Sequence, residues 1–271
     1  MEKSDMDMKV AYKDKMLDLG EVVLLMKDWA MMAGDIQLGH FRKSGLDIAT
    51  KYNDYDVVTI ADKESEKTIL GYIRDFFPGH SILSEESGET EGNSPWRWVI
   101  DPLDGTTNYS QGLPVFSVSI ALEYEGEAVA GVVYAPYLKE MFTAVKGEGA
   151  YLNGQKIGCS GKEELSRAVV ATGMPVDKQE NPDNNLANIA NVVTKVRGLR
   201  RYGSAAIDLC YVAAGYLDAF WELALHRWDI AAGALIASEA GARVEFFRPD
   251  REYSIFASSP QLYPSFRPLI H

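Results

Sequence analysis

The segment WVIDPLDGTTNY, residues 98–109, places two carboxylates beside a turn that favours anion binding. An apolar strand ends at Asp101, and Asp104-Gly105 turns the chain into a helix that begins near Thr106. The N–H groups of Gly105 and Thr106 would attract an anion that the two carboxylates repel. A hard cation such as Mg²⁺ removes this conflict, because it binds carboxylate and phosphate oxygens together.

An ordinary Asp-Gly turn with a helix cap is the structural alternative for this segment. It explains Asp104 and Gly105, but it leaves Asp101 unexplained at the end of a buried strand, directly before Pro102. The segment alone therefore leaves the metal site and the plain turn about equally supported.

Two further segments place acids in comparable positions. Glu85, in the run Ser84-Glu85-Glu86-Ser87, adds a carboxylate at the end of the short strand predicted at 81–84, and Asp229 opens an apolar-faced helix predicted at 229–240. Each acid taken alone is more often structural, as a solvated loop residue or a helix cap. Together they give four acids at strand ends or helix starts, next to the Gly-Thr turn.

The elements that must position these acids fall into two patterns. Before residue 157 we expect helices at 15–43 and from beyond Asp62 to Phe77, with strands at 57–60, 81–84, 96–100, 115–123, 128–134 and 140–145. After residue 158 we expect strands at 168–172, 217–221 and 243–246, alternating with helices at 184–195, 204–214 and 229–240. The sequence thus predicts an α+β half with an antiparallel sheet, 1–157, and an α/β half, 158–271.

Composition excludes several classes of protein. Over 271 residues, 27 Lys plus Arg stand against 39 Asp plus Glu, a formal net charge of −12 that disfavours nucleic acid and anionic membranes as ligands. Two cysteines cannot form a disulfide framework, and no window has the length and hydrophobicity of a signal peptide or a membrane span. These features predict a cytoplasmic protein.

The chain resembles the inositol monophosphatase family of Mg²⁺-dependent, lithium-sensitive phosphomonoesterases. WVIDPLDGTTNY matches the first signature of that family and HRWDIAAGALIASEAG, residues 226–241, matches the second. Weaker similarity covers about residues 20–260, including SEES, DVVTIAD and KGEGAYLNG. The resemblance implies the sugar-phosphatase fold, a layered αβαβα sandwich, and a homodimer.

The resemblance also implies a role for particular residues. Metal ligands would be Glu85, Asp101, the carbonyl of Leu103, Asp104 and Asp229, holding two Mg²⁺ ions, with a third, weaker ion near Glu85 and Glu86. Phosphate would bind the amides of Gly105 and Thr106, and Asp62 with the Thr106 hydroxyl would act on the attacking water, with Glu85 also in the catalytic group. Ser204, Ala205 and Glu222 would contact the alcohol portion of the substrate, and Lys51 would lie near the entrance.

These assignments imply hydrolysis of the phosphate monoester of a small polyol or sugar, with inositol monophosphate as the first choice. Fructose 1,6-bisphosphate is the main alternative, followed by histidinol phosphate, NADP and 3′-phosphoadenosine 5′-phosphate. A regulatory, protein-binding role without dominant catalysis is the alternative from another class.

The C-terminal part departs from the family pattern. The hairpin VEFFRPDREYSIFASS lacks the usual glycine-rich turn, and Pro264 and Pro268 would break the terminal helix that many members have. None of these departures falls on an implied metal ligand.

Overall fold

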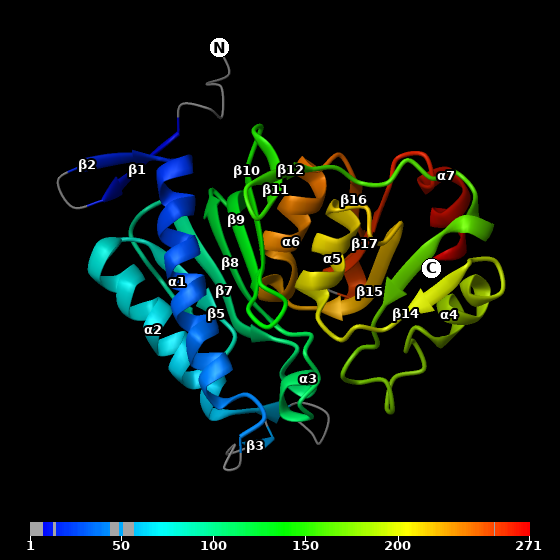
Figure 1. The fold of residues 1–271 in the computed structure, drawn as a ribbon, viewed down its shortest axis with the longest axis horizontal. Coiled ribbons are helices and arrows are strands. Elements are labelled where there is room, and N and C mark those ends of the chain that lie inside the picture. The colour runs from blue at the N-terminus through cyan, green and yellow to red at the C-terminus, as the bar shows by residue number, and fades with distance from the viewer. Residues whose placement is uncertain (1–7, 13–14, 44–48, 51–56, 252) are drawn as a thin grey trace.

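The computed structural model describes residues 8–12, 15–43, 49–50, 57–251 and 253–271, which form five layers (Figure 1). Helices α1 (Leu19–His40) and α2 (Ile60–Phe76) cover the outer face of an eight-stranded sheet. Helices α5 (Ala205–Ala213) and α6 (Arg227–Glu239) separate it from a five-stranded sheet, whose other face packs against α4 (Leu186–Val193) and α7 (Tyr263–Phe266). This is the layered αβαβα sandwich that the family resemblance implies.

The larger sheet has the order β12-β11-β10-β9-β8-β7-β5-β6 and is antiparallel except where β5 pairs with β7. Its strands are β5 (Ser81–Ser84), β6 (Gly88–Thr90), β7 (Trp96–Asp104), β8 (Ser117–Tyr124), β9 (Glu127–Ala135), β10 (Glu140–Val145), β11 (Gly149–Leu152) and β12 (Gln155–Ile157). The single parallel pair matters because it brings two strand ends to the same edge of the sheet.

The smaller sheet has the order β14-β13-β15-β17-β16, with β13 parallel to both of its neighbours and the other pairs antiparallel. Its strands are β13 (Val169–Thr172), β14 (Gly198–Arg200), β15 (Ala219–Leu225), β16 (Arg243–Arg248) and β17 (Tyr253–Ser258). The remaining elements are the pairs β1 (Lys9–Tyr12) with β2 (Lys15–Asp18) and β3 (Ala49–Thr50) with β4 (Val57–Val58), helix α3 (Thr106–Ser110), and the 3₁₀ turns η2 (Leu165–Arg167), η3 (Pro249–Arg251) and η4 (Arg267–Leu269).

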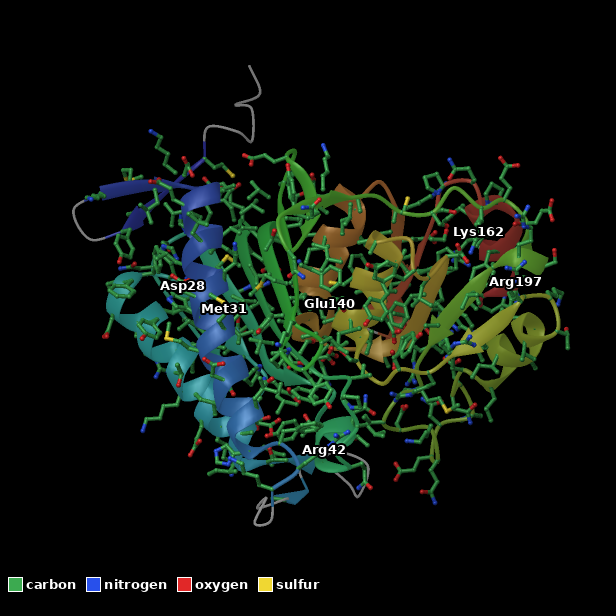
Figure 2. All side chains as sticks on the ribbon, viewed as in Figure 1. Asp28, Met31, Arg42, Glu140, Lys162 and Arg197 are labelled. Carbon is green, nitrogen blue, oxygen red and sulfur yellow. The ribbon has the colours of Figure 1, made fainter. Side chains whose placement is uncertain are left out.

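One hydrophobic cluster runs between the two sheets through the middle helices. Phe142 of the larger sheet, Leu209 of α5, Ile236 of α6 and Phe220 of the smaller sheet all belong to it. Glu140, marked in Figure 2, adds a polar link where it accepts a hydrogen bond from Tyr211 of α5 (Oη to Oε2, 3.1 Å). Because this core is shared, the division into halves at 157/158 stays a prediction, although the larger sheet does end at Ile157.

Two predicted helix starts are wrong by several residues. The helix expected at 15–43 begins only at Leu19, because Lys15–Asp18 pairs with Lys9–Tyr12 and Asp18 caps the helix by accepting the N–H of Glu21 (2.8 Å). Helix α2 begins at Ile60, before Asp62, because Thr59 is its N-cap.

The C-terminal expectation is confirmed. Only the four-residue α7 and the turn η4 follow β17, with Pro264 and Pro268 in their first turns. Proline at the start of a helical turn is compatible with helix, but it prevents the turn from continuing an earlier helix.

Candidate active site

Glu85 and Asp101 reach the same edge of the larger sheet because β5 and β7 run parallel. Ser84 pairs with Ile100, so Glu85 and Asp101 are the next residue on each strand, and the Glu85 N–H donates to the Ile100 carbonyl (3.2 Å). Past Asp101 the pairing of β7 with β8 shifts register before Asp104. Both aspartates, one on each side of this irregularity in the strand, are buried, at 2% and 7% exposed.

Asp104 connects this edge to helix α5 across the middle of the molecule. Its Oδ2 accepts hydrogen bonds from the Ser204 hydroxyl and from the N–H of Ala206 (3.0 Å), both at the helix start. A helix N-terminus stabilises a carboxylate through its unpaired N–H groups. The predicted substrate residue Ser204 therefore holds a predicted metal ligand through its side chain.

Asp229 enters the site from the start of α6. It occupies the third position of the helix and its Oδ2 accepts the N–H of His226 (2.7 Å), the residue that caps the helix. The neighbouring His226 is exposed and lines the cavity, and its ring stacks on Trp228, with centroids 4.6 Å apart.

The acids raise one another's pKa. Burial raises the pKa of Asp101 and Asp229 well above the ordinary value, and the charges of Glu85 and Asp104 raise both further. Burial likewise raises the pKa of Asp104 to about 6, although Ser204 and Ala206 act in the opposite direction. A cation placed among these groups would relieve the repulsion.

The donor set fits Mg²⁺ in its chemistry. Carboxylate oxygens are hard ligands of the kind that Mg²⁺ prefers, and the charges of Glu85, Asp104 and Asp229 all act on Asp101, so the four acids are close enough to share a cation. With the side chains in their present positions, no three His, Cys, Asp or Glu residues of the described ranges are arranged to hold a metal ion. The metal site therefore stays a prediction that rests on the donor set.

Asp62 and Thr106 form a separate hydrogen-bonded pair at the same edge. The Thr106 hydroxyl lies 3.1 Å from Asp62 Oδ1 and 3.0 Å from the carbonyl of Leu103. The other oxygen of Asp62 accepts from the N–H (2.9 Å) and hydroxyl (2.6 Å) of Thr59, the N-cap of α2. Burial raises the pKa of Asp62 to about 6 despite these hydrogen bonds. Thr59 was not predicted, but a threonine three residues before an acid at a helix start is a recognisable capping signal.

Position 105 requires glycine, both for its backbone conformation and for the space around it. Its φ is +90°, and a Cβ there would lie 3.0 Å from the Val115 carbonyl and 3.1 Å from that of Gly203. Helix α3 then starts at Thr106, so its first N–H groups have no carbonyl partner within the helix. This arrangement is compatible with the predicted phosphate contacts of Gly105 and Thr106.

These residues line a cavity of about 410 Å³ between the two halves of the chain. The predicted residues that line it are Glu85, Asp101, Leu103, Asp104, Gly105, Thr106, Ser204, Ala205, Glu222 and Asp229. Asp62 lies behind Thr106 and is itself fully buried. Lys51 lies outside the described residues.

Sequence reasoning missed several residues of the cavity wall. Arg201 and the loop residues Met174, Pro175, Val176 and Lys178 also line the cavity. Arg201 lowers the pKa of Glu222, but burial dominates and raises it to about 7. The only local signal was the position of Arg201, three residues before Ser204 at the start of a predicted helix.

Comparison with known proteins agrees with this architecture. The profile of the inositol monophosphatase family matches residues 18–267. The chain is 44% identical over 240 residues to the Nus factor SuhB of Pasteurella multocida, covering 86% of this chain and 89% of that one. It is 46% identical over 190 residues to the inositol-1-monophosphatase of Mesorhizobium japonicum, covering 70% and 71%.

A solved structure shares the whole fold. The extragenic suppressor protein suhB from Bartonella henselae superposes with a TM-score of 0.86 at 38% identity, covering 92% of this chain and 98% of that one. The five layers and the acid-lined cavity between them define a protein of the inositol monophosphatase fold. The chain belongs to the inositol monophosphatase family.

Proposed function

We propose that the protein is a Mg²⁺-dependent phosphomonoesterase whose best substrate is an inositol monophosphate. The observation that carries this proposal is the contact between Asp62 and Thr106 at the edge where Glu85, Asp101, Asp104 and Asp229 meet. Such a site combines charge neutralisation with a group that can take a proton, which is what phosphoryl transfer to water needs.

Each part of the chain has a defined task in this proposal. The acids Glu85, Asp101, Asp104 and Asp229, with the Leu103 carbonyl, would hold two or three Mg²⁺ ions. Bound Mg²⁺ supplies charge neutralisation of the phosphate and lowers the pKa of an adjacent water. The amides of Gly105 and Thr106 orient the phosphate, as helix-start N–H groups do.

Asp62 and Thr106 act on the water that attacks. When the Thr106 hydroxyl donates to Asp62 Oδ1, its own oxygen can accept a proton from a water aligned with the ester bond. A pKa of about 6 lets Asp62 accept that proton near neutral pH without binding it too tightly.

The residues that line the cavity suit a substrate whose alcohol portion carries several hydroxyl groups. Glu222, with Ser204 and Ala205 beside it, offers acceptors for hydroxyl groups within a cavity of about 410 Å³. Arg201 and Lys178 on the same wall support a second candidate, fructose 1,6-bisphosphate, because they could receive its second phosphate.

The test is phosphate release with and without Mg²⁺ over a panel of the candidate esters. Asp62→Asn is expected to lower kcat by about 10² to 10⁴, the usual contribution of general acid–base catalysis. Asp75→Asn, an exposed acid on the same helix, is the matched control and should match the wild type. Wild-type activity that persists in excess EDTA, or full activity of Asp62→Asn, would contradict the proposal.

A regulatory role is kept as a second class because one relative is named a Nus factor. The Asp62→Asn variant separates the two functions, since it removes catalysis with little change to the surface. If the cellular role is regulatory, cells that carry Asp62→Asn should behave like cells with the wild-type protein. If the role depends on hydrolysis, they should behave like cells that lack the protein.

A further inference from the structure

One wall of the cavity is a loop without helix or strand, residues 173–185, between β13 and α4. Its residues Met174, Pro175, Val176 and Lys178 line the cavity, so the position of this loop sets the shape of the substrate site. Long loops in compact domains are uncommon unless they serve a function or are held by specific contacts.

Both ends of the loop are tied to the smaller sheet. Gly173 passes so close to Glu222 that a Cβ would lie 1.8 Å from Glu222 Oε1. At the other end the buried Asn185 donates to the Thr172 hydroxyl (2.8 Å) and the Gly173 carbonyl (2.6 Å), and accepts from Trp221 Nε1 (2.8 Å). These contacts fix the base of the loop, but they leave its middle unsupported.

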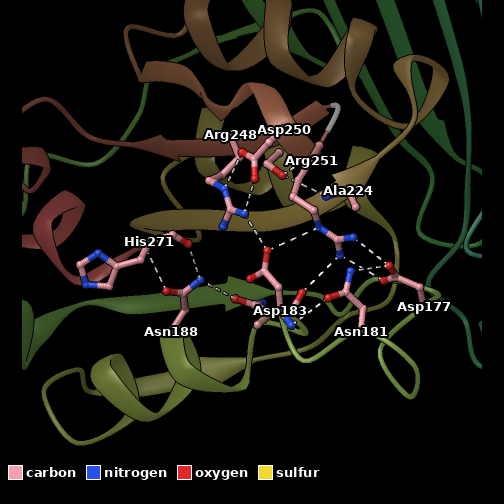
Figure 3. Close-up of polar contacts among 11 residues, drawn as sticks. Asp177, Asn181, Asp183, Asn188, Ala224, Arg248, Asp250, Arg251 and His271 are labelled. Atoms are coloured by element: carbon pink, nitrogen blue, oxygen red, sulfur yellow. Dashed lines mark hydrogen bonds and ion pairs between the residues drawn. The ribbon is translucent and has the colours of Figure 1, made fainter.

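The middle of the loop is held by an arginine from the hairpin turn between β16 and β17. Arg251 binds Asp177 through two parallel hydrogen bonds, Nη1 to Oδ2 at 2.8 Å and Nη2 to Oδ1 at 3.1 Å (Figure 3). Its Nη2 also donates to the carbonyl of Asp183 (3.2 Å), and Asn181 donates to the same Asp177 carboxylate (3.0 Å).

A second arginine, Arg248 at the end of β16, supports the first. Arg248 donates to the Asp183 carboxylate at 2.7 Å and also binds Asp250 within the turn (Figure 3). Arg251 lowers the pKa of Asp177, so the loop carboxylate is charged at neutral pH. Two-pronged Arg–carboxylate pairs within a network are more restrictive than single surface ion pairs.

We propose that Arg251, assisted by Arg248, is a positioning residue that holds loop 173–185 as the wall of the substrate site. Asp177 lies between Val176 and Lys178, which both line the cavity, so a displacement at Asp177 moves them directly. Both arginines lie in the β16–β17 hairpin, whose turn lacks the usual glycine-rich sequence. The proposal rests on the proposed phosphatase function for its kinetic readout.

The test compares Arg251→Met with Arg243→Met. Arg243 lies on the same hairpin, and Arg243→Met removes the same charge. The Arg243 guanidinium, however, stacks on the Tyr263 ring at 3.5 Å and does not hold the loop. With inositol 1-phosphate, Arg251→Met should raise KM roughly ten-fold and leave kcat within about two-fold, because binding is lost and the reacting groups are untouched. Hydrogen exchange should quicken at residues 174–184 in Arg251→Met and stay unchanged in Arg243→Met.

Conservative and double variants decide whether the contact itself matters. The KM of Arg251→Lys should lie between those of the wild type and Arg251→Met, since an ammonium keeps the charge but cannot form both parallel hydrogen bonds to Asp177. Asp177→Asn should also raise KM, and combining it with Arg251→Met should add little if the two residues act through one contact. Should Arg251→Met fail to fold, Asp177→Asn carries the same expectation.

Three results would overturn the inference: an unchanged KM in Arg251→Met, a fall of kcat and Tm with KM constant, or independent effects in the double variant. If the wild type hydrolyses none of the candidate esters, the proposed function fails, and hydrogen exchange alone then judges the positioning role. Unchanged exchange at 174–184 in Arg251→Met would overturn the role in that case as well.

Discussion

At the residue scale, the site concentrates acids that burial and mutual repulsion keep from ionising easily. Asp208 of α5 adds to them: it is 1% exposed, its Oδ1 has no hydrogen-bond partner among the described residues, and burial raises its pKa well above the ordinary value. The charges of Glu222 and Asp104 raise the pKa of Asp208 further, while Arg201 lowers it. Acids arranged in this way cost stability to the protein when no cation is bound.

Removing two of these charges should therefore stabilise the metal-free fold. We expect Asp104→Asn combined with Asp229→Asn to raise the melting temperature in EDTA, because each amide can keep an accepted hydrogen bond without the repulsion. The same variant should lose the stabilisation by Mg²⁺ and the hydrolytic activity. Differential scanning calorimetry of both proteins in EDTA and in Mg²⁺ measures this, and a lower melting temperature of the variant in EDTA would count against the expectation.

At the element scale, glycines let helix α6 approach its neighbours closely enough to place Asp229. A Cβ on Gly131 of β9 would lie 3.2 Å from the backbone of Ala232, and a Cβ on Gly233 would lie 2.9 Å from the Leu209 Cβ of α5. The first contact sets the distance of α6 from the larger sheet, and the second sets its distance from α5.

Gly233→Ala should consequently destabilise the protein, although alanine favours helix. We expect a loss of about 1–3 kcal/mol in the free energy of unfolding, as for overpacked cores. Gly71→Ala is the control, since Gly71 lies within α2 with open space around its Cα, and alanine there should stabilise by up to about 1 kcal/mol. Urea denaturation of both variants gives the comparison, and equal stabilities would show that α5 and α6 are not tightly packed here.

A further contact joins the end of α1 to the site. Arg42, marked in Figure 2, donates to the carbonyl of Gly112 (2.9 Å), just beyond α3. Tyr109 of α3 donates to the carbonyl of Gln37 (2.6 Å), and the Gln37 side chain donates to the Pro102 carbonyl (2.7 Å). The C-terminal end of α1 thus contacts the turn that carries Asp101 and Asp104, and these hydrogen bonds hold that turn in place.

At the scale of the whole molecule, the site lies where the two sheets and the middle helices meet, and its acids come from both halves of the chain. Within the described ranges, no helix has both the length and the hydrophobicity of a bilayer-spanning segment. The homodimer and the cytoplasmic location stay predictions from the resemblance and the composition.

The stability of the metal-free protein should fall as pH rises. The pKa values of Asp62 and Asp104 are raised from 3.8 to about 6, and that of Glu222 from 4.5 to about 7. An acid whose pKa is higher in the folded than in the unfolded state stabilises the fold while it is protonated. This stabilisation is complete below the pKa of the unfolded state, about 4, and is lost as the pH rises through the folded-state values of about 6 to 7.

We therefore expect the melting temperature in EDTA to decrease from about pH 5 to about pH 7.5, and Mg²⁺ to remove most of that decrease. Thermal unfolding across this range, at constant ionic strength, measures the effect. Asp62→Asn should flatten the EDTA curve, whereas a melting temperature that rises with pH in EDTA would argue against ionisation of these acids as the cause.

Local patterns predicted the longer helices and strands and placed several acids of the site, while the roles of the site residues came from the family resemblance. Apolar runs, turn residues and helix caps depend on neighbours a few residues apart, so Asp101, Asp104 and Asp229 could be placed at strand ends and helix starts from the sequence. The hairpin of β1 with β2 and the true start of α2 before Asp62 were missed, as were the short strands β3, β6, β11, β12 and β14. Short strands carry little periodic signal of their own, and the cap at Thr59 was not recognised.

Tertiary structure alone decided how distant segments meet. Asp104 is held by Ser204 and Ala206, about one hundred residues further along the chain, and Asp177 is bound by Arg251, 74 residues away. The sequence by itself determined the α+β and α/β patterns of the two halves, the acid-rich motif and a charge balance that disfavours nucleic acid as a ligand, while the layered sandwich was expected from the family resemblance. Which polar groups contact across the cavity depends on how five layers pack, and no local spacing in the chain encodes that geometry.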